Sequence, residues 1–200
     1  CTFLINSACH FIGTQPYSKK NSARDNSILA IFTYGEGYHN YHHKFQADYR
    51  NGIRWYHWDP TKWLISGMAK LRFAHNLKQV SPDEILKARL TIEEEQLRAR
   101  GVPAETLSSF RFRVEEAQKR LTRLKSDYAA FKATKREQFD KYLQEKRQQY
   151  ELLRDEASVQ YERMFESWTI QKQALRAQVR DAKLQFRVAR QEWKQLREAA

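Results

Sequence analysis

The last 97 residues of the chain, 104–200, contain no glycine, proline or histidine, although the whole chain has 6, 4 and 6 of these residues. Glycine and proline are the residues that most destabilise the interior of a helix, so their absence permits a long uninterrupted one. A continuous helix over 104–200 would be on the order of 145 Å long. We therefore predict that this half of the chain is extended α-helix.

The apolar residues of this half follow the alternating three-four spacing of a coiled-coil seam. The spacing falters near Lys135 and Lys146. A lone helix cannot bury such a stripe, so we expect it to pair with another chain, including a second copy, or to fold back on itself. The seam consists of Leu107, Phe110, Val114, Ala117, Leu121, Leu124, Tyr128 and Phe131, and then of Tyr161, Met164, Trp168, Leu175, Val179, Ala182, Phe186, Ala189, Trp193 and Leu196.

The formal net charge of +12, with aromatic residues among the cations, is compatible with a nucleic-acid-binding module. Such a module needs cations on one face. Residues 81–200 instead mix 26 basic with 20 acidic residues and carry no known nucleic-acid motif. We therefore expect no nucleic-acid partner.

The chain opens on an apolar run, residues 1–12, that predicts a helix ended by Gly13. The run is shorter than the roughly 20 apolar residues that span a bilayer. It begins without an initiator methionine, so it fits the end of a longer membrane segment and a buried helix of a soluble domain equally well. Cys1 and Cys9 are too few for a disulfide framework and match no common zinc motif.

A helix is predicted over residues 61–75, because Asp59 can cap its first turn and Pro60 suits its first position. Its tryptophan and aliphatic residues alternate with Lys62 and further cations, which suits a helix lying in a membrane interface. An ordinary amphipathic helix on a soluble core has the same pattern, and both interpretations stay open.

Two further helix starts are recognisable. Ser81 followed by Pro82 predicts a helix that ends at residues 101–103. Asp25 or Asn26 can cap a shorter helix, because either side chain can accept a free amide hydrogen of the first turn.

Three histidines fall within five residues, at His39, His42 and His43. On a helix these positions share one face, so three imidazoles can point toward one spot, and His10 offers a fourth. Imidazole binds iron, zinc, copper and nickel, and a cluster without cysteine is not typical of a structural zinc site. We predict a metal site here rather than a solvated polar patch, and the spacing leaves the metal open.

The residues Asn6 to His10, the string from Gly35 to His43, and the segments 48–50 and 53–55 together resemble the C-terminal part of membrane acyl-CoA desaturases of the stearoyl-CoA Δ9 type. The string Gly-Glu-Gly-Tyr-His-Asn-Tyr-His-His is similar to the third histidine box of that family. The resemblance covers residues 1–80. Residues 81–200 are outside it, as a helical coiled-coil extension with a break at 101–103.

This resemblance implies an all-α fold, the C-terminal remnant of a helical membrane di-iron domain followed by long coiled-coil helices. It implies an integral membrane protein of the endoplasmic reticulum or the bacterial inner membrane, with the iron site and the coiled coil on the cytosolic side. Two irons, O₂ and two electrons would remove two hydrogens from a saturated fatty acyl-CoA and leave a cis double bond. The electrons would come from a donor of the cytochrome b5, ferredoxin or rubredoxin type.

The resemblance also implies roles for individual residues. His10, His39, His42 and His43 would be iron ligands, and Asn6 would reach an iron through water. Thr2 and Phe3 would line the acyl tunnel, where the family commonly has tryptophan at the position of Phe3. The family's first two histidine boxes do not occur in this chain. Four histidines cannot complete two irons, so we expect this chain alone to be inactive.

Other residues have expected supporting roles. Glu36, Asp48 and Asn40 are candidates to orient the imidazoles by accepting their second N–H. Phe11, Ile31 and Phe32 could exclude water from the metal.

The remaining histidines, His57 and His75, are expected at an interface or at the surface. Lys19, Lys20 and Arg24 could meet phosphates of coenzyme A or of lipids, although solvated charges beside a membrane are the more common case.

Two alternative functions compete with the desaturase interpretation. A structural coiled-coil protein with an incidental histidine cluster would explain residues 104–200 and not the histidine box. A related fatty acid hydroxylase would share the histidine boxes.

Overall fold

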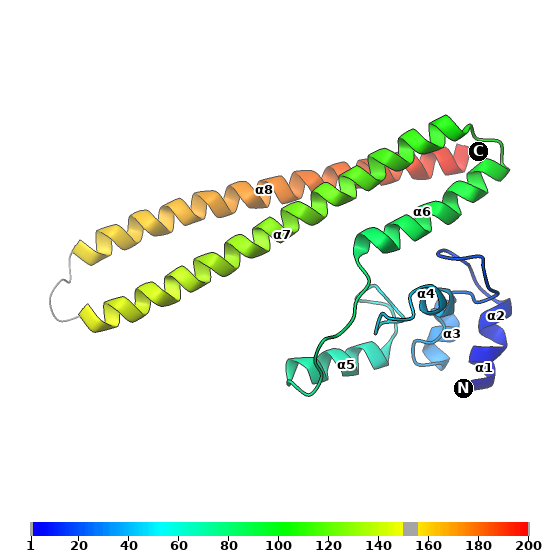
Figure 1. The fold of residues 1–200 in the computed structure, drawn as a ribbon, viewed down its shortest axis with the longest axis horizontal. Coiled ribbons are helices and arrows are strands. Elements are labelled where there is room, and N and C mark those ends of the chain that lie inside the picture. The colour runs from blue at the N-terminus through cyan, green and yellow to red at the C-terminus, as the bar shows by residue number, and fades with distance from the viewer. Residues whose placement is uncertain (1, 150–155, 200) are drawn as a thin grey trace. The chain divides into compact units, whose positions relative to one another are not determined.

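A computed structural model describes residues 2–149 and 156–199, apart from the side chains of Thr2, Leu4, 146–149 and 156–161. The regular elements of this part of the chain are all α-helices, and the only β-type pairs in it are two isolated bridges (Figure 1). The predicted all-α fold is therefore confirmed. The helices belong to two compact units, of which the first runs to Leu107 and the second from Ser108 to Ala199.

The apolar run at the start forms two short helices, α1 (Thr2–Asn6) and α2 (Ala8–Phe11), rather than the single helix predicted. The hydroxyl of Ser7 donates a hydrogen bond to the Phe3 carbonyl, a local bond that competes with the helix ladder. Gly13 follows with a φ of 132°, and a Cβ there would lie 2.4 Å from the Asp25 carbonyl oxygen. Glycine is therefore required where this segment pairs with residue 25.

The histidine box lies on a short helix, α4 (His39–Lys44), which follows α3 (Ser27–Phe32). The side chain of Asn26 caps α3 by accepting from the amides of Ile28 and Leu29, at 2.9 and 3.1 Å. Asp25, the other predicted cap, instead accepts the Tyr41 amide in the first turn of α4, at 3.0 Å. The two candidate caps thus serve two successive helices.

Helix α5 (Pro60–Lys70) begins as predicted, with Asp59 accepting the Lys62 amide at 2.9 Å, but it ends five residues before the predicted end at residue 75. Arg72 adopts a φ of 64°, outside the helical region. The Phe73 amide donates to the Met68 carbonyl and the Arg72 amide to the Ala69 carbonyl, which is the hydrogen-bond pattern of a Schellman C-cap. This C-cap position usually holds glycine, and because it holds arginine here, the sequence did not indicate where the helix ends.

Helix α6 (Pro82–Ala99) confirms the predicted start at Ser81. Ser81 and Glu84 form a reciprocal capping box, in which each side chain accepts the backbone amide of the other residue. The helix stops at Gly101, whose φ is 87°. Helix α6 belongs to the first compact unit, which ends at Leu107. The boundary between the compact units therefore lies after the predicted domain boundary at residue 80.

The second unit contains most of α7 (Ala104–Gln149) and all of α8 (Glu156–Ala199), which run antiparallel side by side (Figure 1). Three contacts between their side chains show this direction. Arg113 forms an ion pair with Glu192 at 2.9 Å, Arg120 donates to Gln185 at 2.8 Å, and Arg176 donates to Tyr128 at 2.8 Å. Of the two predicted ways to bury the seam, folding back is therefore the one observed, and a single helix over 104–200 is wrong.

The predicted seam lies between these two helices. Its described members in the second unit are buried or half-buried, and Val114, Leu121, Ala182 and Trp193 are buried. At Lys135, where the spacing falters, the ammonium lies 4.8 Å from the centre of the Trp168 ring and 5.7 Å from that of Phe131. A cation between aromatic rings thus replaces an apolar residue in the seam. The side chains of Lys146 and Tyr161 lie outside the described part.

We expect Leu121→Ala to lower the free energy of unfolding by about 2 to 5 kcal/mol, because it deletes a fully buried side chain from the seam. Leu184→Ala makes the same change at a side chain that is 55% exposed, and should cost less than about 1 kcal/mol. Urea denaturation followed by circular dichroism measures both. Equal effects of the two substitutions would contradict the observed pairing of α7 with α8.

Candidate metal centre

Three imidazoles from two helices converge on one point. The Nε2 atom of His39 lies 3.1 Å from Nε2 of His10, which comes from α2, and 3.1 Å from Nε2 of His43, one turn further along α4. The three ligand atoms all lie within 4.8 Å of one another. The site therefore joins the N-terminal helix to the histidine box across 29 residues of sequence.

This spacing fits a shared metal ion. Two imidazole nitrogens bound at about 2.1 Å and at a right angle to each other would be roughly 3.0 Å apart. The two separations from His39, each 3.1 Å, match that figure, and the ligand nitrogens of His10 and His43 lie within 4.8 Å of each other. Three imidazole nitrogens are a ligand set that suits iron, zinc, copper or nickel and leaves further coordination positions for other groups.

Burial keeps the central imidazole neutral. Burial, together with the neighbouring imidazoles of His43, His10 and His42, lowers the pKa of His39 to about 4. Burial and the neighbours His42 and His10 lower the pKa of His43 as well. A metal binds the neutral form of imidazole. Because His39 and His43 are already neutral near pH 7, neither has to release a proton before a metal binds.

His42 is next to this cluster and not part of it. Its ring centre lies 6.2 Å from that of His39, in a nearly parallel orientation, and 5.9 Å from that of His43. On an α-helix, position i+4 is rotated by about 40° from position i, and position i+3 by about 60° in the opposite sense. The prediction that His39, His42 and His43 would point to one spot is therefore wrong for His42, and His10 takes its place.

Ser22 orients the His10 ring. Its hydroxyl lies 2.8 Å from Nδ1 of His10, so Nε2 is left to face the cluster. Nothing in the sequence marked Ser22, which lies in a polar connector with no motif of its own. Only the fold brings it back to α2.

Asn40 does not hydrogen-bond to an imidazole in the described part of the chain, contrary to the prediction. Its side chain is fully buried and makes four hydrogen bonds with the backbone of the preceding connector. The side-chain oxygen accepts the amides of Tyr17 and Ser18, at 2.9 and 3.2 Å, and the side-chain nitrogen donates to the carbonyls of Ser18 and Ala23, at 2.7 and 2.9 Å. A residue inside the histidine box thus holds the segment that carries Ser22.

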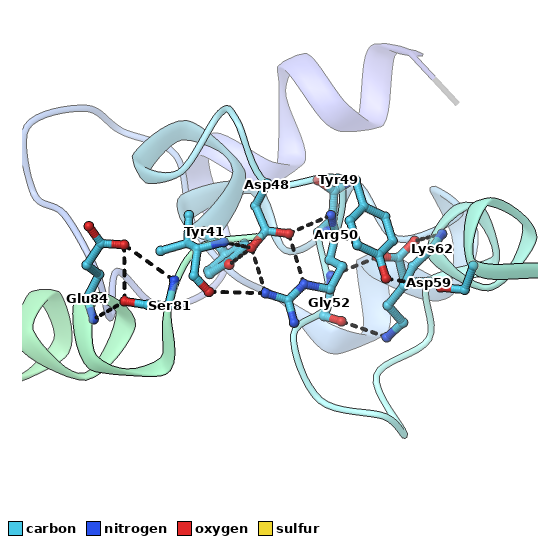
Figure 2. A network of polar contacts seen from close by, with 12 residues as sticks. Tyr41, Asp48, Tyr49, Arg50, Gly52, Asp59, Lys62, Ser81 and Glu84 are labelled. Carbon is cyan, nitrogen blue, oxygen red and sulfur yellow. Dashed lines mark hydrogen bonds and ion pairs between the residues drawn. The ribbon is translucent and has the colours of Figure 1, made fainter. Parts of the chain in front are cut away.

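Asp48 likewise holds backbone segments together rather than a histidine (Figure 2). Its buried carboxylate accepts hydrogen bonds from the Tyr41 hydroxyl at 2.7 Å, from the Arg50 guanidinium at 2.7 and 2.9 Å, and from the amides of Arg50 and Val80. Burial alone would raise the pKa of Asp48, but the bonds from Arg50, Tyr41 and Val80 outweigh it and hold the pKa at about 2. This carboxylate fixes α4 against the segment that leads to α6.

Glu36, the third predicted orienting residue, accepts a hydrogen bond from the side-chain amide of Asn51 at 2.8 Å. Asn51 begins the loop before α5, and the Asp59 carboxylate accepts the amides of Asn51 and Gly52, each at 2.9 Å. The ammonium of Lys62 donates to the Gly52 carbonyl at 2.6 Å on the same loop (Figure 2). Lys62 is therefore a buried loop anchor and not a cation on the outer side of α5.

The remaining histidines differ from each other. His57 is half-buried and stacks on the Tyr38 ring with the ring centres 4.5 Å apart, so it is not at the open surface, which was one of its two predicted places. His75 is exposed, as predicted.

The residues expected to enclose the site are on the outside of the described structure. Phe11 is 80% exposed, and Ile31 and Phe32 are exposed too, so the prediction that they shield the metal is wrong for this chain by itself. Phe3 is 92% exposed and encloses no tunnel here, while the side chain of Thr2 lies outside the described part. Asn6 is exposed at the end of α1.

Two of the three basic residues in the connector have intramolecular partners. Lys19 lies 3.7 Å from the Glu95 carboxylate in an exposed pair, and Arg24 donates to the Gly13 carbonyl at 3.2 Å.

In the described parts of the chain, no helix has both the length and the apolar character needed to cross a bilayer.

Comparison with known proteins confirms the resemblance to acyl-CoA desaturases for part of the chain. Acyl-CoA desaturase 1 of Saccharomyces cerevisiae is 48% identical over 96 residues, which is 48% of this chain and 19% of the relative. A probable acyl-CoA desaturase of Schizosaccharomyces pombe is 44% identical over 117 residues, 56% of this chain and 24% of the relative. Stearoyl-CoA desaturase of Homo sapiens is 42% identical over 85 residues, 42% of this chain and 24% of the relative.

The chain thus spans about a fifth to a quarter of the length of these curated relatives. No protein-family model matches it.

We expect Asp48→Asn to destabilise the chain by about 2 kcal/mol at pH 7, because the folded pKa of about 2 lies below the ordinary value of 3.8. A depressed carboxylate pKa stabilises the fold above the unfolded pKa, and this contribution disappears as the pH falls from about 4 to 2. Urea denaturation at a series of pH values should show the difference from the unsubstituted chain shrinking over that range. Asp127→Asn, at an exposed carboxylate on α7, is the control. A difference that persists undiminished at pH 2 would disprove the role of the Asp48 charge.

Proposed function

We propose that this chain is the C-terminal part of an acyl-CoA desaturase catalytic domain, residues 1–80, followed by a helical coiled-coil extension. The observation that carries the proposal is the convergence of three Nε2 atoms, from His10, His39 and His43, at separations that suit a shared metal ion. The 42–48% identity to acyl-CoA and stearoyl-CoA desaturases supports iron as that metal.

His10, His39 and His43 would hold one iron. His42, on the same helix and turned aside, is available to a second iron, and Asn6 would reach an iron through water. When bound, the irons supply the oxidising chemistry that uses O₂ and two electrons to remove two hydrogens from a saturated acyl chain. Four histidines do not complete two irons, so the chain alone is proposed to be inactive and to depend on histidines from elsewhere.

The residues of this chain prepare the site for that metal. Burial keeps His39 and His43 in the neutral form that binds a metal. Ser22 sets the orientation of His10, and the backbone bonds of Asn40 hold the segment that carries Ser22. These contacts place ligands from two helices at one point before a metal arrives, which lowers the entropy lost when it binds.

The proposed substrate is a saturated fatty acyl-CoA, and the proposed co-substrate is O₂. The two electrons would come from a separate donor of the cytochrome b5, ferredoxin or rubredoxin type. The full-length protein is proposed to be an integral membrane protein of the endoplasmic reticulum or of the bacterial inner membrane, with the iron site on the cytosolic side. Thr2 and Phe3 keep their proposed place along the acyl chain.

Helix α5 is proposed to lie in the membrane interface. Leu64 and Leu71 are 65% and 69% exposed, and Trp63 is exposed beside them, so this face does not pack on the described core. Tryptophan and leucine next to the exposed cations Lys70 and Arg72 suit the boundary between headgroups and acyl chains.

We expect the purified chain to bind Co²⁺, used as a spectroscopic probe of the imidazole cluster. His39→Ala should weaken binding at least about tenfold, because it removes the central nitrogen of the three. Absorbance titration measures the affinity. His75→Ala, at an exposed histidine outside the cluster, is the matched control and should leave affinity unchanged. Equal affinity of the two variants would refute the site.

In the full-length parent protein, His42→Ala should abolish formation of the unsaturated product, because a ligand is lost from the proposed second iron. Fatty acids extracted from cells that depend on this protein give the readout. An undiminished unsaturated product would remove His42 from the ligand set. A hydroxy fatty acid as the product of the unsubstituted protein would show the related hydroxylase reaction instead.

For the interfacial helix, we expect the chain to co-sediment with vesicles that contain phosphatidylserine, and Leu64→Glu with Leu71→Glu to reduce this binding severalfold. The circular dichroism spectrum should be unchanged, because both side chains are exposed. Leu184→Glu, a matched substitution in α8, is the control. Vesicle binding that is unaffected by the α5 substitutions would disprove the interfacial role.

A further inference from the structure

Helix α8 carries a second stripe of three-four spacing on the side turned away from the seam. This outer stripe is offset by two residues from the seam, a rotation of about 200° around the helix. All of its residues are exposed, including Ile170 at 67%, Leu184 at 55% and Val188 at 47%. Its members are Ile170, Ala174, Ala177, Asp181, Leu184 and Val188.

Such an arrangement differs from scattered surface apolar residues. The described part of α7 exposes two large apolar side chains, Phe112 and Leu143, and they are 31 positions apart. On α8 the outer stripe is regular over 19 residues, which is the pattern that receives a further helix in a coiled coil. The hairpin of α7 and α8 therefore exposes a face with the spacing of a helix-pairing surface.

The two flanks of the outer stripe differ in charge. Gln185 and Glu192 lie on one flank, and they are engaged by Arg120 and Arg113 of α7. The other flank, away from these contacts, carries Arg180, Arg187 and Lys194 at seven-residue intervals. Among the described residues, Arg180 and Arg187 have no hydrogen-bond or ion-pair partner, and Lys194 pairs only with Glu198 on its own helix.

These charges disfavour a second copy as the occupant. In an antiparallel pair of outer stripes, the cationic flanks with Arg180 and Arg187 would face each other. In a parallel pair, Asp181 would face its own copy inside the apolar contact. Asp181 also disfavours insertion of the stripe into a lipid bilayer, because a carboxylate is costly in hydrocarbon.

We propose that the outer stripe of α8 binds an amphipathic helix with acidic flanks and a basic residue opposite Asp181. The apolar residues supply the buried contact, the free arginines attract the acidic flanks, and Asp181 fixes the register of the added helix. This inference does not depend on the proposed desaturase function, because it involves only residues of the second compact unit.

Two synthetic helical peptides of equal length test the proposal. Both have leucine in a three-four stripe; one has glutamate flanks with a single lysine opposite Asp181, and the other has lysine flanks. In fluorescence anisotropy with the full chain, the acidic peptide should bind at least about tenfold more tightly than the basic one, and added salt should weaken its binding. Absence of binding, or equal binding of both peptides, would overturn the proposal.

Variants of the chain localise the binding. Leu184→Glu with Val188→Glu should weaken binding of the acidic peptide at least about tenfold, and Arg180→Glu with Arg187→Glu should reverse the preference toward the basic peptide. Leu143→Glu, at an exposed residue of α7, is the matched control. All variants should keep the helical circular dichroism of the chain, because the substituted side chains are exposed.

Two further outcomes would also overturn the proposal that the outer stripe binds an acidic amphipathic helix. One is concentration-dependent dimerisation, seen in sedimentation, that Leu184→Glu abolishes, since the occupant would then be a second copy. The other is loss of binding to phosphatidylserine vesicles in the same variant, since the stripe would then be a lipid contact.

Discussion

The buried carboxylate of Asp48 connects parts of the first unit that are far apart in the sequence. It accepts the Tyr41 hydroxyl from the histidine-box helix and the Val80 amide from the segment that leads into α6, and Arg50 balances its charge. A buried charge without such partners would cost several kcal/mol, so each partner must stay in place for the fold to form. The position of α4, and with it of His39 and His43, depends on this polar anchor.

Polar side chains, rather than a large apolar core, organise the region around the candidate metal centre. Asn40, Asp59 and Lys62 are buried, and each binds backbone groups of a neighbouring loop. Such bonds fix irregular segments at defined positions, where apolar contacts alone would allow them to slide. Ligands on two short helices can therefore converge within hydrogen-bond distance of one another although the helices are only four and six residues long.

The two halves of the chain use charge differently. In residues 1–80, charged groups are sparse and some are buried as anchors. In the second unit, they line the pairing of α7 with α8, as in Arg113 with Glu192, and leave a surplus of cations on the outer side of α8. The net charge of +12 is therefore not one binding surface, and part of it, including Arg180 and Arg187, lies beside the outer stripe.

Much of this protein could be inferred from its sequence because the signals were local. The absence of glycine and proline from residues 104–200 predicted long helices. The capping residues Asn26, Asp59 and Ser81 predicted helix starts, and the histidine box predicted a metal site. Other features depend on contacts across long stretches of chain, which local spacing does not encode. The tertiary structure alone set His42 apart from the cluster of His10, His39 and His43, brought Ser22 to His10, and turned Asp48 and Asn40 toward the backbone. It also showed that the chain folds back on itself, with apolar residues of α7 and α8 buried in one hairpin.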